Sequence, residues 1–145
     1  MSQTGGLYKV TDNELKRQIA DEFSNISDLK EEADLSYFAI NFLEILATYS
    51  DLDKNLIGKI LQGNSSFVPD DGFIGFSNSA EVEINKKDIL DKISIENFDN
   101  YLERAEKDNK SQKQDKEFLQ KYFQNIKSAY EIATKENKAL IFRIG

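Results

Sequence analysis

The sequence predicts one α+β domain over residues 1–145, in which a small mixed β-sheet packs against a cluster of about five or six helices. Short strand-like runs stand at both ends of the chain and in its middle, and segments with helical spacing of apolar residues lie between them. A chain of 145 residues is also long enough to bury one sizeable core. With 39% hydrophobic residues, 7 Gly and 1 Pro, the composition is that of an ordered globular domain.

The first predicted elements are a strand and two helices. Residues 7–10 form a strand-like run, and Thr11 with Glu14 predicts a capping box that opens a helix. The apolar face of this helix is Leu15, Ile19 and Phe23. From Asp34 to Tyr49, apolar side chains cover nearly every side of a helix, which predicts the buried central helix of the core.

A third helix is predicted over residues 51–62 and is followed by a loop. Ser50 with Asp53 forms a second capping-box pattern, and Gly63 stands where a helix C-cap is expected. Residues 64–72 contain the only proline, two aspartates and a glycine, so we expect a surface loop.

The middle of the chain predicts a hairpin and then two helices. Residues 73–76 are apolar, and residues 81–84 alternate between polar and apolar as a half-buried strand does, so the two runs are expected to pair through residues 77–79. Helix starts are expected at Asn85–Asp88 and at Ser94.

The last third predicts a solvated segment, a long helix and a strand. Residues 106–117 carry no large apolar side chain, whereas residues 118–133 have the clearest amphipathic helical pattern of the chain. Residues 139–142 read as a buried strand. Because this strand follows a long helix directly, we expect it to lie beside an earlier strand in the interior of the sheet.

The residue types that are absent exclude several kinds of chemistry. With no His and no Cys, the chain offers neither a Ser-His nor a Cys nucleophile, no disulfide and no structural zinc site. Oxygen ligands for a hard cation are what remains. We therefore expect no cofactor. The lack of these catalytic residue types favours a protein that is not an enzyme.

Net charge points to the kind of partner. The chain carries a net charge of −7, and all of the acidic excess lies in residues 1–72, which hold 6 basic and 13 acidic side chains. An acidic surface repels nucleic acid and anionic lipid and attracts basic proteins. The sequence thus predicts a basic protein partner, no nucleic acid and no membrane association. The first residues resemble no targeting signal, so we expect a cytoplasmic protein. The oligomeric state stays open.

Two acidic patterns are candidate metal sites. Asp70 and Asp71 are adjacent in a loop and would need a third ligand to hold Mg²⁺, while a simple turn explains them as well. Asp51 and Asp53 match the start of a calcium-binding loop, but Gln62 stands where that loop needs a bidentate glutamate.

Three further polar residues are candidates for a binding site or a buried polar role. Glu44 lies within the apolar helix, one turn after Asn41, and a buried carboxylate there would need a partner or a raised pKa. A structural role is the reading we favour, with Glu44 either pointing outward or held in an ion pair. Arg143, near the end of the last strand, could bind a carboxylate or phosphate, although a salt bridge to the acidic half is simpler.

Taken end to end, the chain resembles the YfbM-like family of small bacterial proteins. The opening Gly6-Leu-Tyr-Lys-Val-Thr-Asp-Asn-Glu-Leu15 is similar to the family's Y-x-V-S-x-E-E-L start, and residues 122–142 are similar to its F-x-x-L-x-x-F-Y-x-x-A-x-x-x-x-x-A-V-L ending. The apolar helix around residues 38–46 and the segments 60–63 and 72–76 also correspond. The family's Trp-His-x-Leu-like segment has no counterpart here. The resemblance implies an α+β fold and a cytoplasmic bacterial protein, and it implies no activity and no catalytic residues.

We hypothesise from these observations that the chain is a non-catalytic binding domain, of the type of an immunity protein that neutralises a basic bacterial toxin through an acidic surface. One alternative is a small ligand-binding or divalent-cation-binding domain, or an enzyme, that uses carboxylates. Another is a housekeeping interaction protein.

Overall fold

The computed structural model describes residues 5–35, 39–70 and 72–145, and its centre is a five-stranded sheet. The strands follow the spatial order β2-β1-β5-β4-β3. Their bounds are β1 (Gly5–Val10), β2 (Glu31–Asp34), β3 (Ser65–Phe67), β4 (Phe73–Ser77) and β5 (Ala139–Ile144). The predicted α+β class is confirmed. The sheet was expected to be mixed, however, and every described pairing is antiparallel.

The position of β5 explains why the sheet is antiparallel. Val10 at the end of β1 and Ser77 at the end of β4 pair with Ala139 and Leu140 at the start of β5. The intervening helices therefore return the chain to the end of the sheet that it left, and β5 runs back between both neighbours. The expectation that the last strand lies in the interior beside an earlier strand is confirmed.

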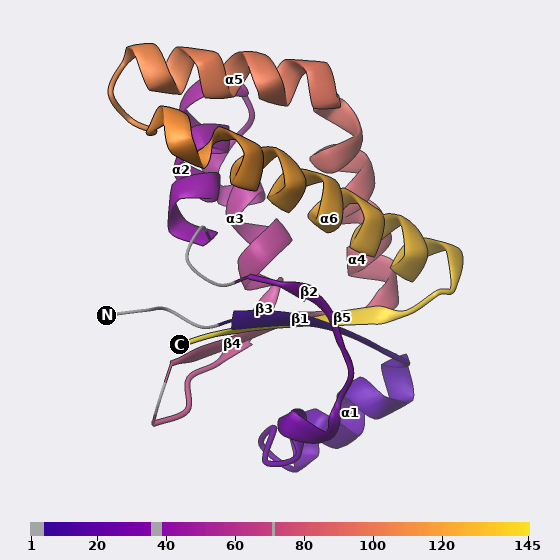
Figure 1. Ribbon diagram of the computed structural model, residues 1–145. Helices are drawn as coiled ribbons and strands as arrows, with labels where there is room; N and C mark the ends of the chain where they lie inside the picture. The colour runs from indigo at the N-terminus through magenta and orange to yellow at the C-terminus, as the bar shows by residue number, and fades with distance from the viewer. Residues whose placement is uncertain (1–4, 36–38, 71) are drawn as a thin grey trace.

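The six helices cover the two faces of the sheet unequally (Figure 1). Helix α1 (Asp12–Ala20) lies on one face of the sheet. The short 3₁₀ turn η1 (Ile26–Asp28) lies on the same face. The other five helices lie on the opposite face: α2 (Ala39–Tyr49), α3 (Lys54–Gln62), α4 (Ser79–Asp88), α5 (Ile95–Lys107) and α6 (Lys116–Lys135). Among them, α5 lies farther from the sheet than α6. Two further 3₁₀ turns, η2 (Leu90–Lys92) and η3 (Lys113–Asp115), precede α5 and α6.

Each face of the sheet has its own hydrophobic core. The larger core lies between the sheet and these five helices and continues among α2, α5 and α6, where the rings of Phe98 and Phe123 stack with centroids 4.4 Å apart and Phe42 packs against both. The smaller core lies under α1 and joins Leu15 and Phe23 to the strands. A sheet that is buried on both faces needs apolar residues on both, which explains the unbroken buried run of residues 139–142.

Several helix boundaries confirm the predicted caps. The Thr11 side chain accepts a hydrogen bond from the Glu14 amide at 3.0 Å at the start of α1, and Ser94 caps α5 in the same way. Helix α6 spans the predicted amphipathic segment, and the chain between α5 and α6 is largely exposed. Gly63 follows α3 with a φ of 74°. The start of α3 differs slightly, because Asp53 is its N-cap and the helix begins at Lys54.

Two expected helix boundaries in the first half are corrected. The central helix is buried as predicted, but Asp34 belongs to strand β2 and the helix is described from Ala39 onward. The predicted helix position Phe38 lies outside the described residues. In α1 the chain leaves the helix after Ala20, so Phe23 reaches the core from a turn in which its own φ is 59°.

The predicted hairpin between residues 73–76 and 81–84 is wrong. Residues 81–84 lie within α4, because Asn78 and Glu81 form a complete capping box that starts this helix. Asn85 is buried inside the same helix and does not start a new one. The hairpin partner of β4 is instead β3, which lies in the segment predicted to be a loop.

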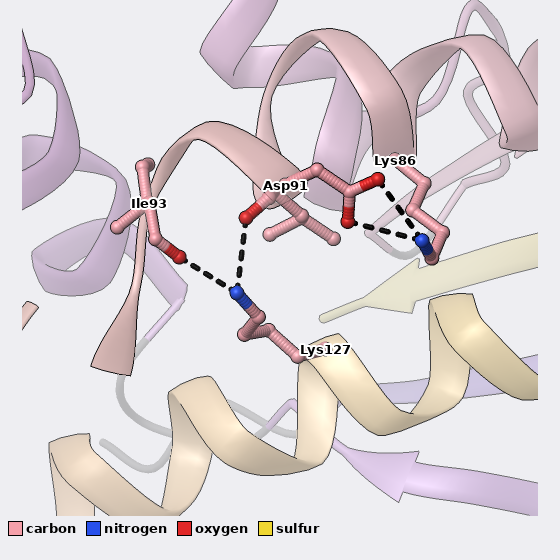
Figure 2. A network of polar contacts seen from close by, with 5 residues as sticks. Lys86, Asp91, Ile93 and Lys127 are labelled. Carbon is pink, nitrogen blue, oxygen red and sulfur yellow. Dashed lines mark hydrogen bonds and ion pairs between the residues drawn. The ribbon is translucent and has the colours of Figure 1, made fainter. Parts of the chain in front are cut away.

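A lysine of α6 holds the connection between α4 and α5 (Figure 2). The Lys127 ammonium donates hydrogen bonds to the main-chain carbonyls of Leu90 at 3.1 Å and Ile93 at 2.6 Å. Beside it, Lys86 forms an ion pair with Asp91 at 3.0 Å. The Leu90 carbonyl also accepts a hydrogen bond from the Ile93 amide at 3.2 Å, so Lys127 is a second donor to it and ties the turn to α6.

Candidate functional site

A bulge in β2 brings two carboxylates to one face of the sheet. Leu7 pairs with Ala33, but the next residue of β1, Tyr8, pairs with Glu31, so β2 carries one extra residue at this point. In a regular strand, residues three apart point to opposite faces. Because of the bulge, Glu31 and Asp34 both lie on the α1 side, where a local change of this kind re-aims side chains.

Gly6 separates these carboxylates from an arginine. Gly6 is the register partner of Asp34 on one side and of Arg143 on the other. With neighbouring strands about 4.8 Å apart, the main chains at Asp34 and Arg143 are about 10 Å apart across the glycine. The absence of a side chain at Gly6 leaves a hollow between the acidic and the basic residue.

This hollow, which we call the Gly6 hollow, has a volume of about 300 Å³. It is lined by Gly5, Gly6, Tyr8, Glu31, Asp34, Arg143 and Gly145. A methyl group added at Gly6 would come within 3.0 Å of the Tyr8 hydroxyl and 3.2 Å of a Glu31 carboxylate oxygen, so both groups converge over this residue. The hollow lies at the end of the sheet where the start of β1 pairs with the end of β5.

The two carboxylates of the hollow affect each other's charge. Burial raises the pKa of the Glu31 carboxyl above its ordinary value, and the neighbouring charge of Asp34 raises it further. Arg143 is exposed and forms no ion pair within the described ranges, so the expected salt bridge to the acidic half is not found there. A cation placed between the two carboxylates would offset the repulsion that raises the pKa of Glu31.

Asp70 and Arg143 come together at a second hollow. It lies on the same face of the sheet, has a volume of about 400 Å³, and is also lined by Phe23 and Ile74. Asp71 lies outside the described residues, so the predicted carboxylate pair stays a prediction. Among the residues that the structure describes, no three acidic side chains gather as a metal site.

Asn41 and Glu44 share a third hollow, on the outer face of α2. Thr48, Tyr49 and Lys110 complete its polar lining, and its volume is about 360 Å³. Glu44 is exposed, so of the two readings of this residue the outward-pointing one holds, and the buried carboxylate is not found. Tyr49 is fixed by a 2.6 Å hydrogen bond from its hydroxyl to Asp108.

The central residues of the Gly6 hollow escaped prediction. The central helix was predicted to begin at Asp34, and no element was predicted at Glu31, because acidic residues are depleted in strands. Of the residues that line this hollow, only Arg143 was a candidate. The signal that could have found it is the pair Gly5-Gly6 at the start of a strand, since glycine inside a strand often marks a close approach or an open site.

Comparison with known proteins defines the fold and not the activity. No family model matches the chain, and no curated protein matches it. A solved structure does: the crystal structure of YfbM from Escherichia coli, described as a protein of unknown function, has a TM-score of 0.67 and 16% sequence identity. The match covers 98% of this chain and 99% of that one. The chain has the YfbM fold.

Because this likeness extends over nearly both whole chains, it confirms the YfbM-like resemblance of the sequence at the level of the fold. YfbM is itself described as a protein of unknown function, so the likeness assigns no activity to this chain. None of the helices in the described part has the length and apolarity that a membrane crossing requires.

Proposed function

We propose that this protein is a cytoplasmic, non-catalytic domain that binds a basic protein partner through the acidic edge of its sheet. The carrying observation is the pair of carboxylates, Glu31 and Asp34, that the bulge of β2 places together over Gly6. An immunity-type role, in which the partner is a basic toxin, is the specific form of this proposal.

Electrostatics supports the proposal in two ways. The acidic excess lies in the first half of the chain, and three of the four residues of β2 are acidic. Strand β2 is also an edge strand, and among the described strands it pairs with β1 alone. Complementary charge accelerates the encounter between proteins and fixes the orientation of docking. Charged residues on an edge also discourage self-pairing of sheets, and the experiment has to separate the two roles.

Affinity capture from native lysate at low and high salt tests the proposal. We expect a stoichiometric basic protein that is retained at low salt and lost at high salt. The double variant Glu31→Lys with Asp34→Lys should abolish the capture. A matched control, Glu83→Lys with Glu117→Lys, makes the same change of charge at exposed positions of α4 and α6 and should retain the partner.

Two results would contradict the proposal: a bait that retains nothing at low salt, or a partner that both double variants lose equally. If the captured protein is toxic when expressed alone, coexpression with this chain should restore growth, and the variant with lysine at 31 and 34 should not. Failure of that rescue would remove the immunity role and leave the binding role.

A further inference from the structure

The hollow beside α2 carries opposite charges on its two sides. We call it the α2 hollow; its volume is about 360 Å³ and its lining is Asn41, Glu44, Ile45, Thr48, Tyr49 and Lys110. We propose that it binds a free α-amino acid with an apolar side chain, whose ammonium group donates to Glu44 and whose carboxylate accepts from Lys110. This site is separate from the proposed protein-binding edge, because α2 lies on the face of the sheet opposite to α1 (Figure 1).

The first argument is a polar stripe on an apolar helix. Asn41, Glu44 and Thr48 stand three and four residues apart, which places them on one face of α2. The other residues of this helix are apolar or aromatic, and one of them, Ile40, is 60% exposed. The polar stripe is therefore not simply the whole solvent-facing side of α2. All three of its residues line the hollow.

The second argument is that the opposite wall is fixed by the end of α5. Asn109 follows this helix with a φ of 59°, and the Lys110 amide then donates a 2.8 Å hydrogen bond back to the Ala105 carbonyl. A left-handed residue followed by such a bond is a standard helix C-terminus that turns the chain sharply. The turn sets the main chain of Lys110 beside the stripe of α2.

Contacts of Tyr49 tie the two walls together. Its hydroxyl donates a 2.6 Å hydrogen bond to Asp108, the C-cap of α5, and the Arg104 guanidinium lies 4.8 Å from the centre of its ring. A cation over an aromatic ring is attracted to it, so both contacts hold the end of α2 against the end of α5. The hollow between the two helices is thus formed before any ligand enters.

The third argument is that the two charges of the hollow do not pair. Glu44 and Lys110 form no ion pair with each other or with another residue in the described part of the chain. A direct pair of exposed side chains gains little, because both ends are well hydrated. A ligand with both an ammonium and a carboxylate gives each side chain a charge-assisted partner and covers the apolar lining as well. The Asn41 amide can donate or accept beside them.

The remaining lining and the volume define the rest of the ligand. Ile45 and the ring of Tyr49 supply an apolar surface between the charged groups. A volume of about 360 Å³ stands near the lower end of the range for small-molecule pockets. The hollow therefore fits a molecule of the size of an amino acid, with an apolar side chain that packs on Ile45 and Tyr49.

The test titrates L-leucine into the whole chain while the amide resonances of Asn41, Glu44 and Lys110 are followed by ¹H–¹⁵N NMR. Three comparison probes each lack one recognised group. Isocaproate lacks the ammonium, isoamylamine lacks the carboxylate, and glycine lacks the apolar side chain. We expect saturable shifts with L-leucine, and binding that is weaker by roughly tenfold or more for each of the other three probes.

Two variants give the proposal a specific signature. Glu44→Gln should weaken binding of L-leucine roughly tenfold and remove its advantage over isocaproate, because the charge that recognises the ammonium is lost. Lys110→Gln should weaken binding to a similar extent and remove the advantage over isoamylamine. Each variant should keep the discrimination that the other one loses. Such a cycle between a residue and a ligand group reports a direct contact.

Controls separate local binding from general effects. Glu83→Gln on α4 and Lys121→Gln on α6 make the same changes of charge at exposed positions outside the hollow, and both should bind L-leucine like the original chain. Glu44 and Lys110 are themselves exposed, so their substitution should leave the unfolding midpoint unchanged. An unchanged midpoint shows that lost binding is not lost folding.

Three outcomes would overturn the proposal: no saturable shift with L-leucine, equal binding of L-leucine and the three comparison probes, or variants that lose both discriminations together. The proposed function is tested independently. The double variant with lysine at 31 and 34 should lose the basic partner and still bind L-leucine, so the failure of either proposal leaves the other one intact.

Discussion

The hydroxyl of Tyr130 offers a sharp test of how the helical layer is held on the sheet. Tyr130 on α6 is completely buried, and its hydroxyl donates a 2.7 Å hydrogen bond to the main-chain carbonyl of Ile60. Within a longer helix that carbonyl would accept from the amide of Asn64, but Asn64 donates to Phe76 in β4 instead. The Tyr130 hydroxyl therefore donates to a carbonyl near the end of α3 that has no helical amide as its donor.

The change Tyr130→Phe removes the donor and leaves that carbonyl buried. Leaving a buried acceptor unsatisfied costs about 1–3 kcal/mol of stability, and the deleted oxygen adds only a small void. For a chain of this length, a loss of about 2 kcal/mol corresponds to a fall in Tm of about 4–8 °C. Urea denaturation should show a lower midpoint with an unchanged slope.

The same substitution should change the alkaline limit of stability. Burial raises the pKa of the Tyr130 hydroxyl well above its ordinary value of 10.0, so the folded protein keeps the neutral form. Below pH 10 the hydroxyl is neutral in both states and its contribution is complete. Above pH 10 the unfolded chain ionises first, and stability falls by up to about 1.4 kcal/mol per pH unit for this residue. In the Tyr130→Phe variant, stability should fall less steeply with rising pH, because the contribution of this one hydroxyl is removed.

Tyr101→Phe is the matched control. Tyr101 is half-buried on α5 and its hydroxyl forms no hydrogen bond within the described ranges, so its loss should cost less than about 0.5 kcal/mol. Equal stability losses in the two variants would show that the Tyr130 bond contributes nothing specific. An unchanged alkaline slope in Tyr130→Phe would refute the role given to burial.

Three further perturbations test other parts of the fold. Gly75→Ala should cost about 3 kcal/mol or more, because its methyl group would lie 1.9 Å from the carbonyl oxygen of Gln62, and thermal unfolding measures the loss. Glu22→Gly should stabilise the protein by about 0.5–1 kcal/mol, since Glu22 lies in the turn after α1 with a φ of 53° and glycine adopts that conformation without strain; a lower urea midpoint would contradict this. Deletion of residues 139–145 removes the strand between β1 and β4 and should unfold the domain, and a soluble product with a cooperative transition would show otherwise.

The spacing of apolar residues predicted those elements that carry a continuous apolar face or run of their own. Helix α6 has a continuous apolar face and β5 a continuous apolar run, so each is recognisable without knowledge of its neighbours. Strand β2 is not, because its three acidic residues are tolerated only at the edge of a sheet. The alternating residues 81–84 fit a strand and a helix equally well. The Asn78–Glu81 capping box decided between them, and it was legible in the sequence.

The candidate site was less predictable than the fold, for a physical reason. Whether Glu31 and Asp34 share a face depends on one extra residue in β2, and local sequence does not specify where a register shifts. Arg143 joins them only because β1 and β5 pair across more than a hundred residues of chain. Asn41 and Glu44 were predicted to be neighbours because helical spacing alone brings them together, and they do line one hollow.

Two kinds of glycine separate the stability of this fold from its proposed function. At Gly63 and Gly75, an added methyl group would strike main-chain atoms of Phe76 and Gln62 at 2.3 Å and 1.9 Å, so these glycines let α3 approach β4. At Gly6, the same methyl group would meet side-chain atoms of Tyr8 and Glu31 at 3.0–3.2 Å, so these side chains would have to shift by a few tenths of an ångström. The size limit at Gly6 is thus set by side chains and not by the main chain. Gly6→Ala should leave the domain folded, and a loss of partner binding in this variant would report on the hollow.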